Sequence, residues 1–185
     1  MRLTNNPAYS STTYNNTWCI GANGNYVHAV WADLRDGNNE IYYKRSTDGG
    51  ASWGADTRLT NDTAQSWNTS VAVSGSSIHV VWIDSRADNW EIYYKRSTDG
   101  GSSWGSDVRL TSDASYSEFP SVSVSGSNLH VVWADNRDGN YEIYNKHSAD
   151  GGVTWGAETR LTNNPQFSLT PSVSVSGNSV HVGWR

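Results

Sequence analysis

Four histidines recur every 51 residues, each three positions before a tryptophan: His28, His79, His130 and His181. Imidazole is a common metal ligand, so a repeated histidine raises the question of a metal site. A metal ion holds its ligands at about 2 Å, and each repeat offers one histidine in the middle of an apolar run. Residues of separate repeats meet so closely only where they line a common axis. We therefore predict that the histidines form hydrogen bonds between repeats, and we expect no metal and no cofactor.

A second repeated motif, Trp-x-Asp-x-Arg, ends in an arginine once per repeat, at Arg35, Arg86 and Arg137. Three converging guanidinium groups could grip a substrate carboxylate. Each arginine, however, follows an aspartate of its own motif by two residues, at Asp33, Asp84 and Asp135. We therefore predict charge pairs that tie loops together.

Two short segments combine aspartate, glycine and asparagine: Asp36-Gly37-Asn38 and Asp138-Gly139-Asn140. Their oxygens could bind calcium, but the ligand spacing of a dedicated calcium loop is absent. Aspartate followed by glycine is also a strong turn signal. We interpret both segments as turns.

Aromatic residues vary in type in the loops that follow the Arg-Leu-Thr and Trp-x-Asp-x-Arg motifs, while the surrounding frame repeats. Exposed aromatic rings beside Asn, Asp and Ser suit the stacking and polar contacts that bind sugar rings. The alternative is that these rings cap strand ends against their neighbours. The candidate ligand-binding residues are Trp67, Trp90, Tyr116, Tyr141, Tyr9 and Phe167.

The element that must position these loops is a repeated turn with the pattern Ser-x-Asp-x-Gly-x-x-Trp. In each copy the aspartate can accept hydrogen bonds from turn amides, and the glycine permits a backbone conformation that other residues resist. The tryptophan can fold back beneath the turn. The three copies are Ser46, Asp48, Gly50 and Trp53; Ser97, Asp99, Gly101 and Trp104; and Ser148, Asp150, Gly152 and Trp155.

This pattern resembles the Asp-box, or BNR, repeat of sialidase-like β-propellers. The resemblance implies that the Asp-box is structural and lies on the face away from the active site, in a family of hydrolases, lectins, receptors and assembly factors. Sialidase chemistry would need three converging arginines, a Tyr–Glu nucleophile pair, an acid/base aspartate and usually an Arg-Ile-Pro motif. This sequence contains no Arg-Ile-Pro, and half a ring cannot assemble a central active site alone. We therefore predict no catalytic residues.

A fixed period of about 50 residues indicates a propeller or another repeat array. Each unit reads as four strands separated by turn residues, and runs such as Ile78–Trp82 are apolar on both faces, as in a sheet covered on both sides. We predict an all-β fold of four-stranded antiparallel blades, with three full blades and a partial one, as a half-propeller. The expected segments are 1–15 for an outer strand and link, 16–60, 67–111 and 119–162 for the blades, and 171–185 for the two strands of the partial blade.

The first unit is five residues longer than the others, and we place the extra residues in the link Asn5–Thr17. The fourth unit lacks its third strand and its Asp-box. An unpaired strand edge is a template for association. We therefore expect a homo-oligomer, a two-fold dimer closing one ring, in which Arg2–Thr4 of one chain joins the partial blade of the other.

The formal charge of −5 argues against a nucleic-acid or membrane surface as partner. The one cysteine, Cys19, excludes an intrachain disulfide and is interpreted as a small core residue. No stretch is apolar and long enough to span a membrane, and no signal peptide precedes the first repeat. From the resemblance we expect the parent protein to be secreted or at the cell surface.

The preferred function is a non-catalytic scaffold or a glycan-binding module. The alternatives are a fragment of a sialidase-like glycoside hydrolase, an engineered or excised repeat fragment without a ligand, and a protein-interaction platform.

Overall fold

A computed structural model describes residues 3–4, 6–12 and 18–185, which form four antiparallel sheets with no helix among them. The first sheet contains β1 (Ser10–Ser11), β2 (Ile20–Asn23), β3 (Tyr26–Asp33), β4 (Glu40–Ser46) and β5 (Thr57–Arg58). The second contains β6 (Ser66–Ser74), β7 (Ser77–Asp84), β8 (Glu91–Ser97) and β9 (Val108–Arg109). The third contains β10 (Ser117–Ser125), β11 (Asn128–Asp135), β12 (Glu142–Ser148) and β13 (Thr159–Arg160). The fourth contains β14 (Ser172–Ser176) and β15 (Ser179–Gly183).

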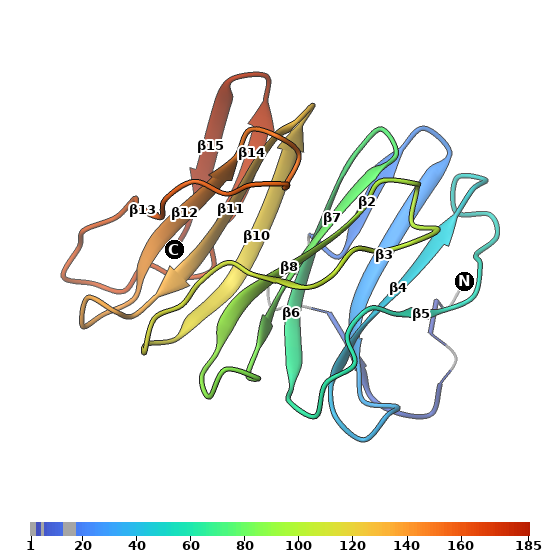
Figure 1. Ribbon diagram of the computed structural model, residues 1–185, viewed down its shortest axis with the longest axis horizontal. Helices are drawn as coiled ribbons and strands as arrows, with labels where there is room; N and C mark the ends of the chain where they lie inside the picture. The colour runs from blue at the N-terminus through green and yellow to red at the C-terminus, as the bar shows by residue number, and fades with distance from the viewer. Residues whose placement is uncertain (1–2, 5, 13–17) are drawn as a thin grey trace.

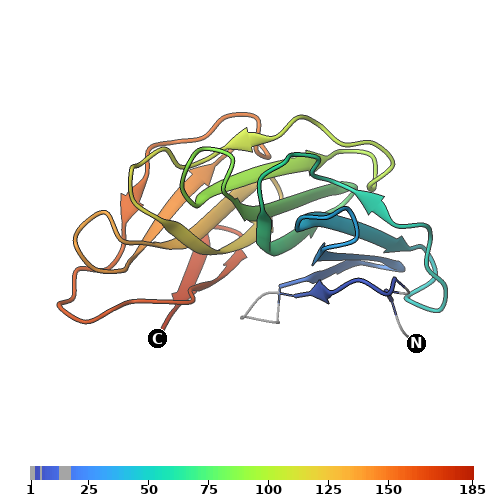
Figure 2. The same ribbon diagram turned by 90° about the horizontal axis from the view of Figure 1, so that it is seen from below.

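The four sheets stand face to face, one after another along the chain (Figure 1). Figure 2 shows that they follow an arc, with the first and fourth sheets at its two open ends. Within the described residues, no helix is long and apolar enough to cross a membrane.

Apolar side chains fill the junctions between neighbouring sheets. Because successive side chains of a strand point to opposite faces, a strand apolar on both faces can contact two sheets. In β7, Val80 and Trp82 pack with the first sheet, whereas Val81 and Ile83 pack with the third. The expected double covering of this strand is therefore present.

The innermost strand of the first sheet is divided into β1 and β2, which both pair with β3. Ser10 pairs with Asp33, as Ser66 pairs with Asp84 in the second sheet, and Ile20 pairs with Ala29, as Val71 pairs with Val80. The sheet thus begins before residue 16, and Ser10–Ser11 belong to it, not to a link. Compared with the second sheet, five extra residues separate Ser11 from Ile20, and residues 13–17 of this segment lie outside the described part of the chain.

The expected outer strand Arg2–Thr4 and the link Asn5–Thr17 lie partly outside the described residues. Within the described part, Lys44 Nζ donates to Leu3 O at 3.0 Å. In the next sheet Lys95 Nζ donates in the same way to Leu59 O, next to β5. Leu3 therefore lies against the first sheet as the segment after β5 lies against the second.

The repeated turns follow the third strand of each complete sheet and are held by their own side chains. In the second copy, the Ser97 hydroxyl donates to Asp99 Oδ1 at 2.8 Å and accepts from the Gly101 amide at 2.9 Å. Asp99 Oδ1 also accepts the amide of Ser103 at 2.9 Å. The three glycines at the position of Gly101 all have a positive φ, which explains the residue type.

These turns also hold neighbouring sheets together. Trp104 meets Tyr43 of the preceding sheet edge to face, with ring centroids 4.9 Å apart. Arg45 Nη1 donates to Gly100 O at 2.7 Å, and Tyr43 packs directly on Gly101. Trp104 therefore packs between the first and second sheets.

Candidate functional site

Strand pairing separates the two ends of each sheet. In the second sheet Ser66, Asp84 and Glu91 lie at one end, while Ser97 and the turn that follows it lie at the other. The loops carrying the candidate aromatic residues are therefore opposite the repeated turns.

A bulge in successive inner strands shapes the aromatic end. The pairing register shifts between Trp67 and Ser70 and again between Glu118 and Ser121. At equivalent positions 51 residues apart, φ is positive: 49° at Asn68, 55° at Phe119 and 49° at Thr170. Asparagine tolerates this region, whereas it strains phenylalanine and β-branched threonine. Such strain is concentrated at functional sites, so these positions mark the region as a candidate.

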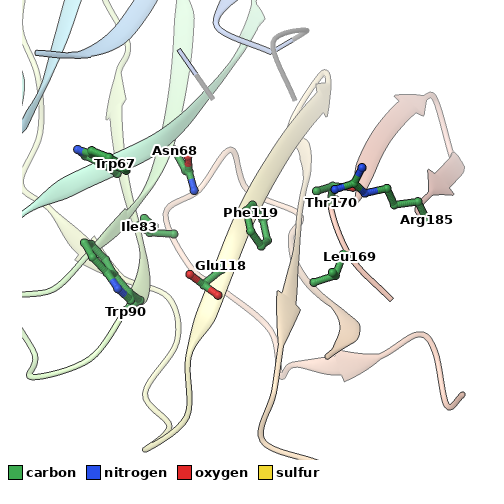
Figure 3. Close-up of a pocket in the computed structure, with 9 residues that line it drawn as sticks. All are labelled: Trp67, Asn68, Ile83, Trp90, Glu118, Phe119, Leu169, Thr170 and Arg185. Carbon is green, nitrogen blue, oxygen red and sulfur yellow. The ribbon is translucent and has the colours of Figure 1, made fainter. Parts of the chain in front are cut away.

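A pocket of about 450 Å³ opens between these bulges. Three pairs of adjacent residues line it, each from an inner strand or from the segment just before one: Trp67–Asn68, Glu118–Phe119 and Leu169–Thr170. Ile83, Trp90 and Arg185 complete the lining. Figure 3 shows Trp67 and Trp90 on one side, Glu118 and Phe119 in the middle, and Thr170 and Arg185 on the other side.

The pocket combines aromatic surface with a few polar groups. Trp67 and Trp90 are half-buried, so each indole retains an accessible part. Asn68 offers an amide, Glu118 a carboxylate and Arg185 a guanidinium group. This mixture suits an apolar ring face with hydroxyl groups around its rim.

A tyrosine outside the pocket lining, Tyr141, contacts the pocket residue Glu118. The Tyr141 hydroxyl donates to Glu118 Oε2 at 2.6 Å. Burial, and then this hydrogen bond to Glu118, raise the pKa of Tyr141 above the usual value for a phenol. A protonated phenol donates a hydrogen bond that positions the carboxylate of Glu118, and it is a poor nucleophile.

The structure brings together some of the predicted ligand residues and separates others. Trp67 and Trp90 share the pocket, and Tyr141 reaches it through Glu118. Phe167 is 65% exposed and meets Tyr141 edge to face, whereas Tyr116 lines a separate hollow of about 360 Å³. Tyr9 is 65% exposed beside the first sheet and is absent from the pocket lining.

Sequence reasoning missed the four polar and charged residues of the pocket lining, which are Asn68, Glu118, Thr170 and Arg185. A signal was nevertheless present. The pairs Trp67–Asn68, Glu118–Phe119 and Leu169–Thr170 occupy equivalent positions and differ completely in type, while a serine repeats directly before each pair and again two residues after it. Variation at one position of a repeated frame is what a site built from several repeats produces.

The repeated arginines are committed to structural ion pairs. Arg86 Nη2 lies 2.6 Å from Asp84 and its Nη1 lies 2.8 Å from Asp107, while its guanidinium group covers the Tyr93 ring. Burial alone would raise the pKa of Asp84, but hydrogen bonds from Arg86 and Trp82 hold it below its ordinary value. Arg35 and Arg137 make the same contacts in their sheets. The predicted charge pairs are present, and each guanidinium group is held by two carboxylates of its own repeat.

Three of the four repeated histidines, His28, His79 and His130, bond within a sheet, which corrects the expectation of bonds between repeats. His28 Nδ1 lies 2.7 Å from Tyr43 Oη and His79 Nδ1 lies 2.8 Å from Tyr94 Oη, in each case on the neighbouring strand. Burial, and secondarily a nearby arginine, lower the pKa of His28 and His79 to about 4. No group of three or more metal-ligating side chains occurs in the described part of the chain.

The two Asp-Gly-Asn segments form turns, as predicted. Gly37 and Gly139 have φ values of 97° and 93°. Asp36 accepts a hydrogen bond from Tyr42 and lies 3.3 Å from Arg58. Its carboxylate is therefore engaged by neighbouring side chains.

Three solved structures with a similar fold are glycoside hydrolases. Trypanosoma rangeli sialidase superposes with a TM-score of 0.63 and 19% identity, and the match covers 91% of this chain and 34% of the sialidase chain. The GH93 α-L-arabinofuranosidase of Fusarium graminearum, solved with arabinobiose, superposes with a TM-score of 0.63 and 16% identity. This match covers 85% of this chain and 53% of the arabinofuranosidase chain. The NanB sialidase of Streptococcus pneumoniae superposes with a TM-score of 0.56 and 14% identity. This match covers 85% of this chain and 25% of the NanB chain.

These likenesses show a sialidase-like β-propeller fold, and the chain spans between a quarter and about half of the length of these structures. The sequence matches no protein-family model and no curated protein. At such low identity the comparison establishes the fold alone.

Proposed function

We propose that this chain is a non-catalytic, glycan-binding part of a sialidase-like β-propeller, with its site in the pocket between the inner-strand bulges. The observation that carries the proposal is the convergence of Trp67 and Trp90 on one pocket that also contains polar groups. A sugar presents an apolar face of C–H groups and a rim of hydroxyl groups. Indole rings suit the face, and Asn68, Glu118 and Arg185 suit the rim.

Hydrolysis is less well supported than binding. Most glycoside hydrolases need two carboxyl groups on either side of the scissile bond. Glu118 is the only carboxylate among the described residues that line the pocket. Arg35, Arg86 and Arg137 are held by ion pairs.

A glycoside hydrolase fragment is the second candidate, and the Tyr141–Glu118 hydrogen bond favours it. A tyrosine beside a glutamate is the type of pair that sialidase chemistry uses. The raised pKa of Tyr141 opposes that role in this chain. On this reading Glu118 would have to take the tyrosine proton as the sugar is attacked.

Titration of the protein with a panel of mono- and oligosaccharides, followed by tryptophan fluorescence, tests the binding proposal. A binding sugar should change the emission, and Trp90→Ala should weaken its affinity at least about tenfold, as loss of a central aromatic contact does. Tyr116→Ala is the matched control because it removes an exposed aromatic residue outside the pocket. Binding that survives the double change Trp67→Ala/Trp90→Ala would place the site elsewhere.

Fluorogenic sialosides and arabinofuranosides distinguish the two candidates. We expect no turnover above a heat-inactivated sample. Turnover that is lost in both Tyr141→Phe and Glu118→Gln, each with an unchanged melting temperature, would replace the binding module with an enzyme fragment.

A further inference from the structure

Each junction between sheets contains a backbone amide that the preceding inner strand satisfies. Val71 N donates to Trp18 O at 2.7 Å, Val122 N to Ser70 Oγ at 3.3 Å and Val173 N to Ser121 Oγ at 3.3 Å. The three donors occupy one repeat position, since they pair with Val80, Val131 and Val182. The edge of one inner strand is thus hydrogen-bonded by the inner strand before it.

The junction between the third and fourth sheets extends this contact into a row. Val175 N donates to Ser123 Oγ at 3.1 Å and Gly177 N to Ser125 Oγ at 3.0 Å. Alternate residues of a strand direct their amides to the same side, and alternate serines direct their hydroxyl groups to the same face. Three hydroxyl groups on β10 therefore match three amides along β14 and the turn after it.

The fourth sheet presents the next row of hydroxyl groups. Ser172, Ser174 and Ser176 of β14 stand 51 residues after Ser121, Ser123 and Ser125. The valines between them point toward the third sheet, where Val173 is fully buried. Ser174 and Ser176 are exposed, so this row points away from the rest of the chain.

The first sheet carries the matching amide edge. Ile20 pairs with Ala29, which places it at the repeat position of Val71, Val122 and Val173. Cys19 O accepts the Val30 amide, so the alternate residues Ile20 and Ala22 direct their amides away from β3. Ile20 is 53% exposed and Ala22 is exposed. This edge of β2 is therefore accessible.

We propose that the Ser172–Ser174–Ser176 row of one chain binds the β2 edge of a second copy, through the amides of Ile20, Ala22 and Gly24. The occupant follows from continuity, because contacts between serine hydroxyl groups and strand amides already join the second sheet to the third and the third sheet to the fourth. Figure 2 places the first and fourth sheets, which carry these two surfaces, at the open ends of one arc. In a two-fold dimer, the serine row of each chain binds the β2 edge of the other chain. The same contact therefore occurs twice and covers both ends of both arcs.

Light scattering and analytical ultracentrifugation at several protein concentrations test this contact. We expect a reversible species with the mass of two chains. A larger multiple would also support the contact, because head-to-tail docking need not close at two. A single-chain mass throughout the micromolar range would overturn the proposal, even if the two surfaces then bound a different partner.

A serine double variant tests whether the row carries the contact. Ser172→Ala/Ser174→Ala should raise the dissociation constant by about 10- to 100-fold, the effect expected from two lost hydrogen bonds. Ser179→Ala is the matched control, since it removes an exposed hydroxyl group from β15 of the same sheet. A dimer that the double variant weakens no more than the control would assemble through another surface.

Ala22→Pro tests the other side of the contact. Proline removes an outward amide while the bonds between β2 and β3 remain, as tolerated on an edge strand. The variant should lose dimer while its circular dichroism spectrum stays that of the wild type. An unchanged dissociation constant in a folded variant would refute the proposed register.

Discussion

A methyl group at Gly101 would collide with the preceding sheet. A Cβ atom built on this residue overlaps Tyr43 Oη and lies 2.6 Å from Tyr43 Cζ. Tyr43 is only 1% exposed and its hydroxyl group is bonded to His28, so the ring has no free space to enter. Gly101→Ala must therefore shift the ring, the hydrogen bond or the turn.

Gly50→Ala is the matched control. Gly50 has a φ of 92° against 82° at Gly101, so both changes force alanine into the left-handed region at a cost of about 1–2 kcal/mol. The nearest atom to a Cβ at Gly50 is Trp53 Cζ2, at 4.0 Å. The two variants share the backbone strain, and only Gly101→Ala adds a clash between sheets.

The difference between these variants can be estimated from the structure. Overpacking costs about 1–3 kcal/mol, and disturbing a buried hydrogen bond costs about 1–3 kcal/mol. Gly101→Ala should therefore lower the free energy of unfolding by about 2–6 kcal/mol more than Gly50→Ala. Urea unfolding followed by tryptophan fluorescence measures both values.

A double variant tests the cause. Asn145 occupies the position of Tyr43 in the third sheet, so Tyr43→Asn places a side chain there that the repeat already contains. In that background Gly101→Ala should cost no more than Gly50→Ala. Equal costs for the two glycine variants in the wild-type background would refute the role given to Tyr43.

Three further changes should affect stability. Lowering the pH from about 6.5 to about 4 should destabilise the fold, because His79 stays neutral in the folded chain but takes up a proton in the unfolded chain. This histidine alone accounts for a loss of up to about 3 kcal/mol in the free energy of unfolding, and His79→Gln should flatten the pH dependence of the urea midpoint. Trp104→Ala should cost about 3 kcal/mol and Trp53→Ala less, since Trp104 also packs on the preceding sheet; equal melting temperatures would contradict this. Arg86→Ala should cost about 3–5 kcal/mol by leaving the buried Asp84 carboxylate without its partner, and a variant that unfolds like the wild type would show that the pair is dispensable.

Local chemistry made much of the fold predictable from the sequence. Ser97, Asp99 and Gly101 satisfy one another within a single turn, so their types and spacing indicate the turn without knowledge of the rest of the chain. The Asp84–Arg86 pair is equally local. The 51-residue period extends this reasoning from one repeat to the next.

Contacts between strands and between sheets required the tertiary structure. The sequence shows His79 at a fixed interval, but its partner Tyr94 follows from pairing across β7 and β8. The division of the first inner strand into β1 and β2 follows from the pairing of Ser10–Ser11 with β3, which the sequence does not indicate.

The candidate site shows the same division between local and distant information. Aromatic type alone identified Trp67 and Trp90, but it also selected Tyr9 and Tyr116, which lie outside the pocket. Glu118 was missed because a carboxylate in a strand has no distinctive local pattern. The sequence by itself determined the repeat, the turns and the charge pairs, because those interactions join residues close together in the chain. The tertiary structure alone decided which loops meet, because convergence depends on the bulges and on the angle between sheets, to which residues throughout the repeat contribute.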